Sequence, residues 1–433
     1  MSIAAPGVPD PQPIRTIAEA GTYVTRVCFK HGPPAKTGIE LEWLVLDPHD
    51  PDRRPDVPTL AALLGQHAPA TLVAGSPAAP LPHGGLVTVE PGGQLEISSP
   101  PASSVTGLIA AVSADIQALQ ALIAPAGFEL SGLAADPHRL PHRILTTPRY
   151  NAMADRFDEF GPAGRVMMCS TAAAQVCLDL GTRAEAADRW RAAHQLGPVL
   201  LAAFANSPRT AGDLVPAAAS TRMSSWWSLD PERSRPPASL VPEDYVQRVL
   251  DTHVLARRRD SGDWRLEQPL TLREWIESGE PLSTADLDLH LSTLFPPVRP
   301  QGYLEIRYLD AQPGQEWTVP LALLTALFAG PEPVRQVLEC TDAGADRWQQ
   351  ATEHGLADPV LRAIAAQLVD IAQPGLDSLG LPPAVRAEVD GVLHRRLREG
   401  ISPGSEVLRT VTLDPTTLDT TPPARALTAE GHR

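Results

Sequence analysis

The chain has 433 residues, 43% hydrophobic and 20% charged, so it can form a sizeable core and is not disordered throughout. Its 36 basic and 51 acidic residues give a net charge of −15, which argues against binding to nucleic acids or anionic membranes. Four cysteines without CxxC spacing, and an N-terminus without the pattern of a signal peptide, indicate a reducing cytoplasm. The longest strongly apolar run, residues 319–330, is too short to cross a bilayer.

The first half of the chain predicts two acidic strands. Residues 38–47 alternate in polarity, so Glu40 and Glu42 should project together from one face of a strand. Residues 86–98 form a second strand candidate, which a turn at 91–93 interrupts. We expect helices at 14–31 and 104–124, and a flexible N-terminus at 1–13.

The second half contributes two further strand candidates. One is 165–180, and the other is 302–310, where Glu305 and Arg307 share a face. The proline-containing stretch 207–240 is typical of a loop. Helices are expected at 185–205, 243–256, 271–279 and 283–294 and in the remainder to about residue 400, followed by a flexible tail at 412–433.

Strands that alternate irregularly with helices favour an α+β fold with a largely antiparallel sheet. We see no internal repeat and no convincing linker, and therefore expect one domain over residues 14–411. The fold class predicts a sheet that carries the active site and helices that flank it.

Common nucleotide-binding and hydrolase signatures are absent from the sequence, including the Walker A loop, GxGxxG, HExxH and GxSxG. The remaining candidates are glutamates on strands: Glu40 with Glu42, Glu90 with Glu96, and Glu305 beside Arg307. A solvated sheet face would explain any one pair. If the three strands share one sheet face, divalent cations would offset the repulsion, and carboxylates around Mg²⁺ are a common way to hold a nucleoside triphosphate.

The exact residues are more specific than this pattern. Distinctive sequence blocks follow one another over residues 36–310: 38–42, 90–98, Met167-Met168, Thr171, Gln175-Val176, Leu178-Asp179, 205–208, Arg222, Trp226, Arg233 and 304–307. In this order they resemble the glutamate–cysteine ligase superfamily, especially its plant-like branch and the actinobacterial ligases of ergothioneine synthesis. This resemblance implies a catalytic fold like that of glutamine synthetase and the guanido kinases.

The resemblance also implies roles for individual residues. Mg²⁺ would be the cofactor and ATP a co-substrate, with arginines for phosphate or transition-state charge and one arginine as a carboxylate clamp. The implied metal ligands are Glu40, Glu42, Glu96, Glu305 and Gln175; the catalytic arginines are Arg307 and Arg233; the substrate-binding residues are Arg222, Met168, Thr171, Trp226, Trp227 and Tyr308.

The implied activity is ATP-dependent ligation of the γ-carboxylate of L-glutamate to the amine of L-cysteine through γ-glutamyl phosphate. No protein nucleophile is needed, and no obligate protein partner is predicted. Two alternatives stay open: a ligase of the same superfamily that uses another amine, and a non-catalytic protein that binds a metal or an amino acid. The loop at 207–237 departs most from the family pattern and is the feature that would discriminate between amines.

Overall fold

The computed structural model describes residues 11–406, and within them the strands form one antiparallel sheet. Its order is β2-β3-β1-β5-β7-β6, and β4 pairs with another part of β1. The expected α+β class with an antiparallel sheet is confirmed. The strands are β1 (Thr37–Leu46), β2 (Leu86–Val89), β3 (Leu95–Ser98), β4 (Glu129–Ser131), β5 (Ala173–Leu178), β6 (Val298–Pro300) and β7 (Leu304–Asp310).

Strand β1 lies between β3 and β5 and carries the alternation that the sequence predicts. Its residues Ile39, Leu41, Trp43 and Val45 are buried in the core, so the intervening glutamates face the other way. Glu42 lies opposite Glu96 of β3, and Glu40 lies opposite Gln175 of β5. Side chains directly opposite each other on neighbouring strands are close, so this register groups the carboxylates on one face of the sheet.

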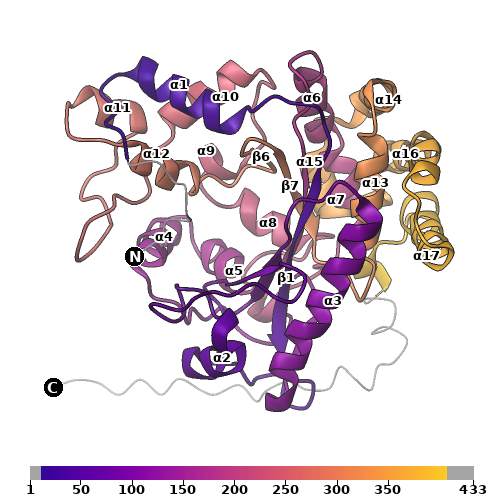
Figure 1. The fold of residues 1–433 in the computed structure, drawn as a ribbon, viewed down its shortest axis with the longest axis horizontal. Helices are drawn as coiled ribbons and strands as arrows, with labels where there is room; N and C mark the ends of the chain where they lie inside the picture. Colours follow the sequence, from indigo (N-terminus) through magenta and orange to yellow (C-terminus); the bar gives the residue numbers. More distant parts are fainter. Residues whose placement is uncertain (1–10, 407–433) are drawn as a thin grey trace.

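Helices cover both faces of the sheet. Figure 1 shows α3, α13, α14, α16 and α17 on one side of β1, and α4, α5, α8, α11 and α12 on the other. The first group, with its neighbours, comprises α3 (Val105–Ile123), α6 (Ala186–Gln195), α7 (Gly197–Ala203), α13 (Thr318–Leu327), α14 (Pro331–Thr341), α15 (Trp348–His354), α16 (Pro359–Ser378) and α17 (Pro383–Leu393).

The helices of the second group lie on the side of the sheet that carries the glutamates. Helix α2 (Val57–Leu64) packs against α3 at the end of the sheet. The others are α1 (Ile17–Cys28), α4 (Pro148–Asp158), α5 (Ala163–Cys169), α8 (Thr221–Trp227), α9 (Pro231–Ser234), α10 (Pro242–Asp251), α11 (Leu272–Glu277) and α12 (Thr284–Leu291).

Helix α3 and the turn after it, Val105–Ala126, are long and apolar enough to span a membrane by length and composition alone. This stretch is longer than the run at 319–330 that the hydropathy of the sequence singles out. Its residues Leu108, Val112 and Leu119 are buried in the main hydrophobic core, as in the core helix of a folded domain. Ser104 caps the helix by accepting a hydrogen bond from the backbone N–H of Gly107.

Two predicted segments differ from the structure. The first half of the expected strand at 165–180 is helix α5, and β5 begins only at Ala173. Ala163 and Val166 are spaced for one buried helix face, and a short apolar run does not distinguish helix from strand by periodicity. The expected loop at 207–240 contains α8 and α9, because Ser220 and Asp230 cap short helices between the prolines.

The predicted domain begins at residue 14, which the structure describes, and its predicted end at residue 411 lies outside the described residues. The main hydrophobic core includes residues from Ile14 to Leu397. Of the N-terminal segment 1–13, only 11–13 are described, and there Gln12 accepts a backbone hydrogen bond from Thr284. The expected tail at 412–433 lies outside the described residues.

The turn between β2 and β3 packs tightly against α5. Gly93 has a φ of +92°, which suits glycine, and its N–H closes the turn onto the carbonyl of Glu90. A Cβ atom on Gly92 would lie 2.3 Å from the carbonyl oxygen of Cys169, the last residue of α5. The close approach requires glycine at position 92 and fixes the hairpin relative to the helix.

We therefore expect Gly92→Ala to lower the free energy of unfolding by about 1–3 kcal/mol, because the added methyl group must push the turn away from α5. Urea denaturation measures the change. Gly32→Ala is the matched control, since a Cβ atom there meets no atom within 4 Å, and it should leave stability within about 0.5 kcal/mol of the wild type. Equal effects of the two substitutions would contradict the close approach.

Candidate active site

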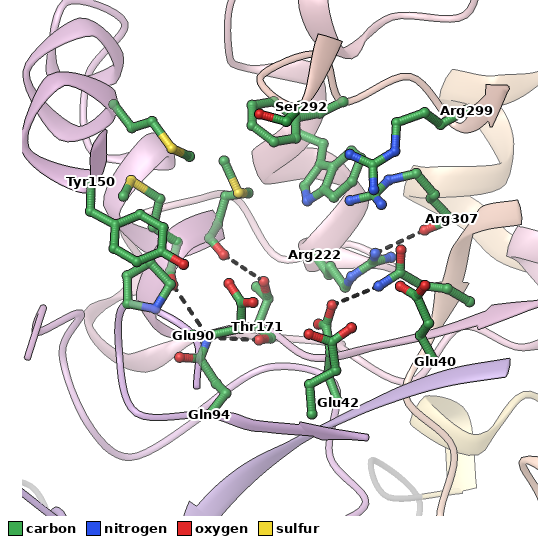
Figure 2. A pocket seen from close by; sticks show the side chains of 18 of the residues that line it. Glu40, Glu42, Glu90, Gln94, Tyr150, Thr171, Arg222, Ser292, Arg299 and Arg307 are labelled. Carbon is green, nitrogen blue, oxygen red and sulfur yellow. Dashed lines mark hydrogen bonds between the residues drawn. The ribbon is translucent and has the colours of Figure 1, made fainter. Parts of the chain in front are cut away.

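A cavity lies between the glutamate face of the sheet and helices α4, α5 and α8, and its empty volume is about 850 Å³. Figure 2 shows Glu40 and Glu42 on one side, Arg222, Arg299 and Arg307 facing them, and Gln94 and Tyr150 at the far end. The lining residues are Glu40, Glu42, Glu90, Pro91, Gln94, Glu96, Arg149, Tyr150, Met153, Met167, Met168, Thr171, Gln175, Arg222, Trp226, Ser292, Phe295, Arg299 and Arg307.

The carboxylates on the sheet differ in their partners. Glu42 accepts hydrogen bonds from the Gln175 side chain (2.8 Å) and from the backbone N–H of Ala173 (2.9 Å). Glu96 accepts one from the Thr88 hydroxyl. The side chains of Glu40 and Glu90 have no ion pair and no hydrogen bond within the described part of the chain, so they are the carboxylates free to bind an incoming cation.

Burial and mutual repulsion favour the protonated forms of these glutamates. Burial raises the pKa of Glu40 to about 7, and the charge of Glu305 adds to this rise. Burial likewise raises the pKa of Glu90 to about 7, with Glu42 as the main neighbouring charge. The pKa of Glu96 is well above its ordinary value for the same reasons. If all of these carboxyl groups ionised, the sheet face would carry more negative charge than its surroundings neutralise.

Glu305 of β7 behaves differently because cations enclose it. It is fully buried and accepts two hydrogen bonds from the Arg299 guanidinium, at 2.6 and 2.8 Å, and one from Gln301 at 3.0 Å. Arg307 also donates to it. Burial opposes its ionisation, but the two guanidinium groups outweigh burial and hold the pKa of Glu305 at about 2. Glu305 is therefore an ionised carboxylate at the edge of the cavity.

Helix α8 brings a guanidinium to the cavity. Arg222 is almost fully buried, donates to the backbone carbonyl of Arg307 (2.8 Å) and pairs with Asp310 at 3.6 Å. The guanidinium carbons of Arg222 and Arg307 lie 5.0 and 5.4 Å from the centre of the indole ring of Trp226, one turn later on α8. This stacking orients both guanidinium groups along the cavity.

The structure brings together most of the residues that the sequence predicts for the site. Glu305 lies behind Arg299 and Arg307 rather than on the cavity wall. The predicted residues that line the cavity are Glu40, Glu42, Glu96, Gln175, Arg307, Arg222, Met168, Thr171 and Trp226.

Arg233 lies outside the cavity, contrary to its predicted catalytic placement. It is buried under α9, where it pairs with Asp230 (3.2 Å) and donates to the carbonyls of Thr293 (3.1 Å) and His253. Its donors therefore hold the segments after α10 and α12 together. The eleven-residue separation from Arg222 contains the break between α8 and α9, which turns Arg233 away.

Trp227 and Tyr308, predicted as substrate-binding residues, also lie outside the cavity. Trp227 follows Trp226 on α8, so its ring points to another side, where its indole N–H donates to Thr352 (2.7 Å). Tyr308 is fully buried on the helical side of β7, and its hydroxyl donates to the carbonyl of Ala193 on α6 (3.2 Å). Neither side chain is available to a substrate in this cavity.

The structure adds residues that sequence reasoning missed or left open. Glu90, which the resemblance does not name as a metal ligand, lines the cavity. Arg299 lies directly opposite Glu305 in the β6–β7 pair. The register of this hairpin is the feature from which Arg299 could have been predicted as a site residue. Arg149 and Tyr150 begin helix α4, whose sequence has no periodic pattern that points to the sheet.

A magnesium ion fits the donors of this cavity. Among residues 11–406, no three His, Cys, Asp or Glu side chains are grouped closely enough to coordinate an ion by themselves. Mg²⁺ usually takes only one or two protein carboxylates and completes its octahedron with waters and substrate phosphates. The unpaired Glu40 and Glu90, and the buried Oε1 atom of Gln175, which has no hydrogen-bond partner, are oxygen donors of the kind that Mg²⁺ prefers.

The raised carboxylate pKa values predict that stability and Mg²⁺ binding depend on pH. A glutamate with a raised pKa in the folded state stabilises the fold below its unfolded pKa, and this contribution is lost as pH rises through the folded value. The metal-free protein should lose about 1–3 kcal/mol between about pH 5 and pH 8 through the pKa values of Glu40 and Glu90. Mg²⁺ should raise the melting temperature more at pH 8 than at pH 5.5.

Differential scanning fluorimetry after chelation and MgCl₂ addition measures this dependence. Glu40→Gln should flatten the pH profile and weaken the Mg²⁺ shift. Glu129→Gln, at an exposed carboxylate of β4, is the matched control and should behave as the wild type. A Mg²⁺ shift that is equal at both pH values in the wild type would contradict the assignment of these carboxylates to the ion.

Comparisons with known proteins agree with the resemblance seen in the sequence. The family model described as Glutamate-cysteine ligase family 2 (GCS2) matches residues 36–418. Glutamate–cysteine ligase EgtA of Mycobacterium tuberculosis is 36% identical over 377 residues, 84% of each chain. The chloroplastic glutamate–cysteine ligase of Arabidopsis thaliana is 28% identical over 352 residues, 74% of this chain and 65% of that protein.

Among solved structures, a glutamate–cysteine ligase of Francisella tularensis in complex with AMP has a similar fold. The TM-score is 0.54 at 13% identity, and the match covers 89% of this chain and 86% of that one. The family match spans most of the chain and includes every strand that borders the cavity. The chain belongs to glutamate–cysteine ligase family 2.

Proposed function

We propose that this protein joins the γ-carboxylate of L-glutamate to the amine of L-cysteine with ATP as co-substrate, giving γ-glutamylcysteine, ADP and phosphate. The observation that carries the proposal is a cavity in which glutamates without an ion pair face a set of guanidinium groups. Membership of the family and the names of its relatives support glutamate and cysteine as the substrates. The AMP complex of the Francisella tularensis neighbour supports ATP.

A carboxylate does not acylate an amine in water unless it is activated first. In the proposed reaction, a γ-carboxylate oxygen of glutamate attacks the γ-phosphorus of ATP, and ADP leaves. The amine of cysteine then attacks the acyl phosphate, forms the amide bond, expels phosphate and loses a proton. Phosphoryl transfer of this kind depends mostly on positioning and charge neutralisation, which the cavity offers without a protein nucleophile.

The arginines from the β6–β7 hairpin suit the phosphate groups. Arg307 lines the cavity with a buried Nε atom that has no hydrogen-bond partner, and Arg299 lies beside it. Both now donate to Glu305, so arriving phosphates would share donors that a carboxylate already orients. We assign Arg307 to the transferred phosphoryl group, and we assign Arg299 to the negative charge of the same group.

Mg²⁺, when bound, would neutralise the phosphates and orient them for in-line transfer. The side chains proposed to hold it are Glu40, Glu42, Glu96 and Gln175, to which the structure adds Glu90. The predicted ligand Glu305 is left out, because it lies behind Arg299 and Arg307, which bond to both of its oxygens. Glu42 and Gln175 bond to each other, so Gln175 orients the Glu42 carboxylate from the neighbouring strand.

Arg222 is proposed to hold a carboxylate of glutamate, since its planar guanidinium can donate two parallel hydrogen bonds. Trp226 would form one wall of this subsite, with an indole N–H that is buried and lacks a partner in the described structure. Met168 and Thr171 lie at the junction of α5 and β5, where the Gln94 amide fixes their backbone by bonds to both carbonyls. These residues would shape the glutamate pocket.

The acceptor subsite is assigned by elimination to the far end of the cavity. Tyr150 and Met153 give this end walls of low polarity, in place of the predicted Trp227 and Tyr308, and the charged Glu90 and Arg149 lie near them. Such walls suit a small uncharged side chain such as that of cysteine. The runner-up function, a ligase for a different amine, differs only in this subsite.

The cellular context is proposed from family likeness alone. The sequence resemblance to actinobacterial ligases favours ergothioneine biosynthesis as the use of the product, and the cytoplasm as its place. We propose no protein partner, nucleic acid or membrane surface for the reaction.

The acyl-phosphate route predicts where an isotope label goes. Glutamate labelled with ¹⁸O in its γ-carboxylate, incubated with Mg-ATP and cysteine, should transfer one ¹⁸O atom to inorganic phosphate for each γ-glutamylcysteine formed. Mass spectrometry of phosphate and nucleotides measures the label. Label in AMP would indicate adenylation and would overturn the proposed route.

The acceptor assignment predicts a graded amine preference. α-Aminobutyrate, in which a methyl group replaces the thiol, should be accepted with a kcat/KM about 10- to 100-fold below that of cysteine. Lysine and glutamate should be poorer acceptors, since a longer charged side chain must be buried beside Tyr150 and Met153, at some cost in desolvation. Phosphate release with a panel of amines measures the order. A charged amine that outcompetes cysteine would favour the alternative ligase.

A further inference from the structure

Asp310, at the end of β7, is a buried carboxylate to which the proposed reaction gives no part. Its side chain is only about 1% exposed and uses both oxygens as acceptors. One oxygen accepts from the backbone N–H of Asn206 and the hydroxyl of Ser207, each at 2.7 Å; the other accepts from the hydroxyl of Ser220 at 3.0 Å. A carboxylate so fully bonded and buried is costly to place unless it serves another group.

An irregularity in the sheet brings Asp310 to the cavity side. Val176 of β5 pairs with Ile306, whereas Ala174 pairs with Leu309, so two residues along β5 correspond to three along β7. In a regular ladder, Asp310 would face away from Glu305 and Arg307. The extra residue reverses the alternation and places Asp310 opposite Ala173, on the side of Arg222.

Three of the partners of Asp310 connect it to Arg222 or to the helix that carries Arg222. The guanidinium pairs with Asp310 at 3.6 Å. The hydroxyl of Ser207, which donates to Asp310, also accepts from the backbone N–H of Arg222 at 3.1 Å. Ser220, the other donor, is the N-cap of α8 and accepts from the backbone N–H of Met223 at 3.2 Å. Asp310 thus holds the guanidinium and, through two serines, the first turn of the helix that carries it.

We propose that Asp310 is a positioning residue that orients Arg222 to receive the carboxylate of the amino-acid substrate. The inference rests on the proposed function of Arg222. Apart from Asp310, Glu42 is the carboxylate whose charge acts on Arg222. Without Asp310, the guanidinium would turn toward Glu42, away from the substrate, and would occupy a carboxylate proposed for the metal ion.

Asp310→Asn tests this role with little change in size. It should raise the KM for glutamate about 10- to 100-fold, because an amide cannot hold the guanidinium as a carboxylate does, and change the KM for ATP less than about threefold. Asp358→Asn is the matched control: Asp358 is also buried, pairs with an arginine (Arg347, 2.7 Å) and caps a helix, α16. Steady-state kinetics should show no selective effect there.

A milder variant covers the possibility that Asp310→Asn does not fold. Ser207→Ala removes one donor to Asp310 and the acceptor for the N–H of Arg222, and should raise the KM for glutamate about 3- to 10-fold with the KM for ATP unchanged. A loss of kcat without a change in the KM for glutamate, in either folded variant, would overturn the proposal. So would equal changes for glutamate and ATP, or the same pattern in Asp358→Asn.

A double-mutant cycle separates this proposal from the proposed function. Thermal unfolding of Asp310→Asn, Arg222→Lys and the double variant, without substrates, should show that the Asp310→Asn effect is at least halved in the Arg222→Lys background. Additive effects would overturn the positioning role whatever the enzyme does. If the wild type forms no product from glutamate, the proposed function fails, and the cycle then decides the role of Asp310 by itself.

Discussion

Mutual repulsion among glutamates on one sheet face is the constraint on which the rest of the site depends. The central strand β1 contributes Glu40 and Glu42, and its antiparallel neighbours place Glu96 and Gln175 opposite them. Buried carboxylates at this density are tolerated only with compensating charge, and the sheet itself contributes little of it. The other elements around the cavity are arranged to deliver that charge, as guanidinium groups or as space for a cation.

The positive charge that compensates the glutamates is unevenly distributed, so the two ends of the cavity differ in charge. At the β6–β7 hairpin, Arg299 and Arg307 neutralise Glu305 in full. Glu40 on β1 and Glu90 just after β2 form no ion pair within residues 11–406, although arginines act on both from a distance. One end of the site therefore holds cations in place before any ligand arrives, and the other attracts a cation from solution. In the proposed reaction, the arginines would suit phosphate oxygens, and the carboxylates without an ion pair would suit the cation that accompanies them.

The sequence predicted the parts of the site that follow from strict alternation along a strand. Glu40 with Glu42 and Glu305 with Arg307 were paired correctly because side chains of a strand repeat every two residues. The same rule could not foresee the extra residue that reverses β7 near Tyr308, nor the capped turn that makes α8 a helix. The sequence did not predict Arg149 as a site residue, because its position in the cavity depends on how helix α4 packs in the tertiary structure. The predictions that succeeded depend on local sequence, whereas those that failed depend on how separate elements pack together.

The glycine turn between β2 and β3 has a consequence for how the protein can change over evolutionary time. Gly92 touches the end of α5 so closely that any side chain there must displace the helix, and the following Gln94 bonds the backbone of Met168 and Thr171. Substitutions in the turn and in the helix are therefore coupled, so that a change in one requires a compensating change in the other. A lineage that altered the helix to admit a new substrate would have to find a compensating turn, which makes this corner slow to diversify.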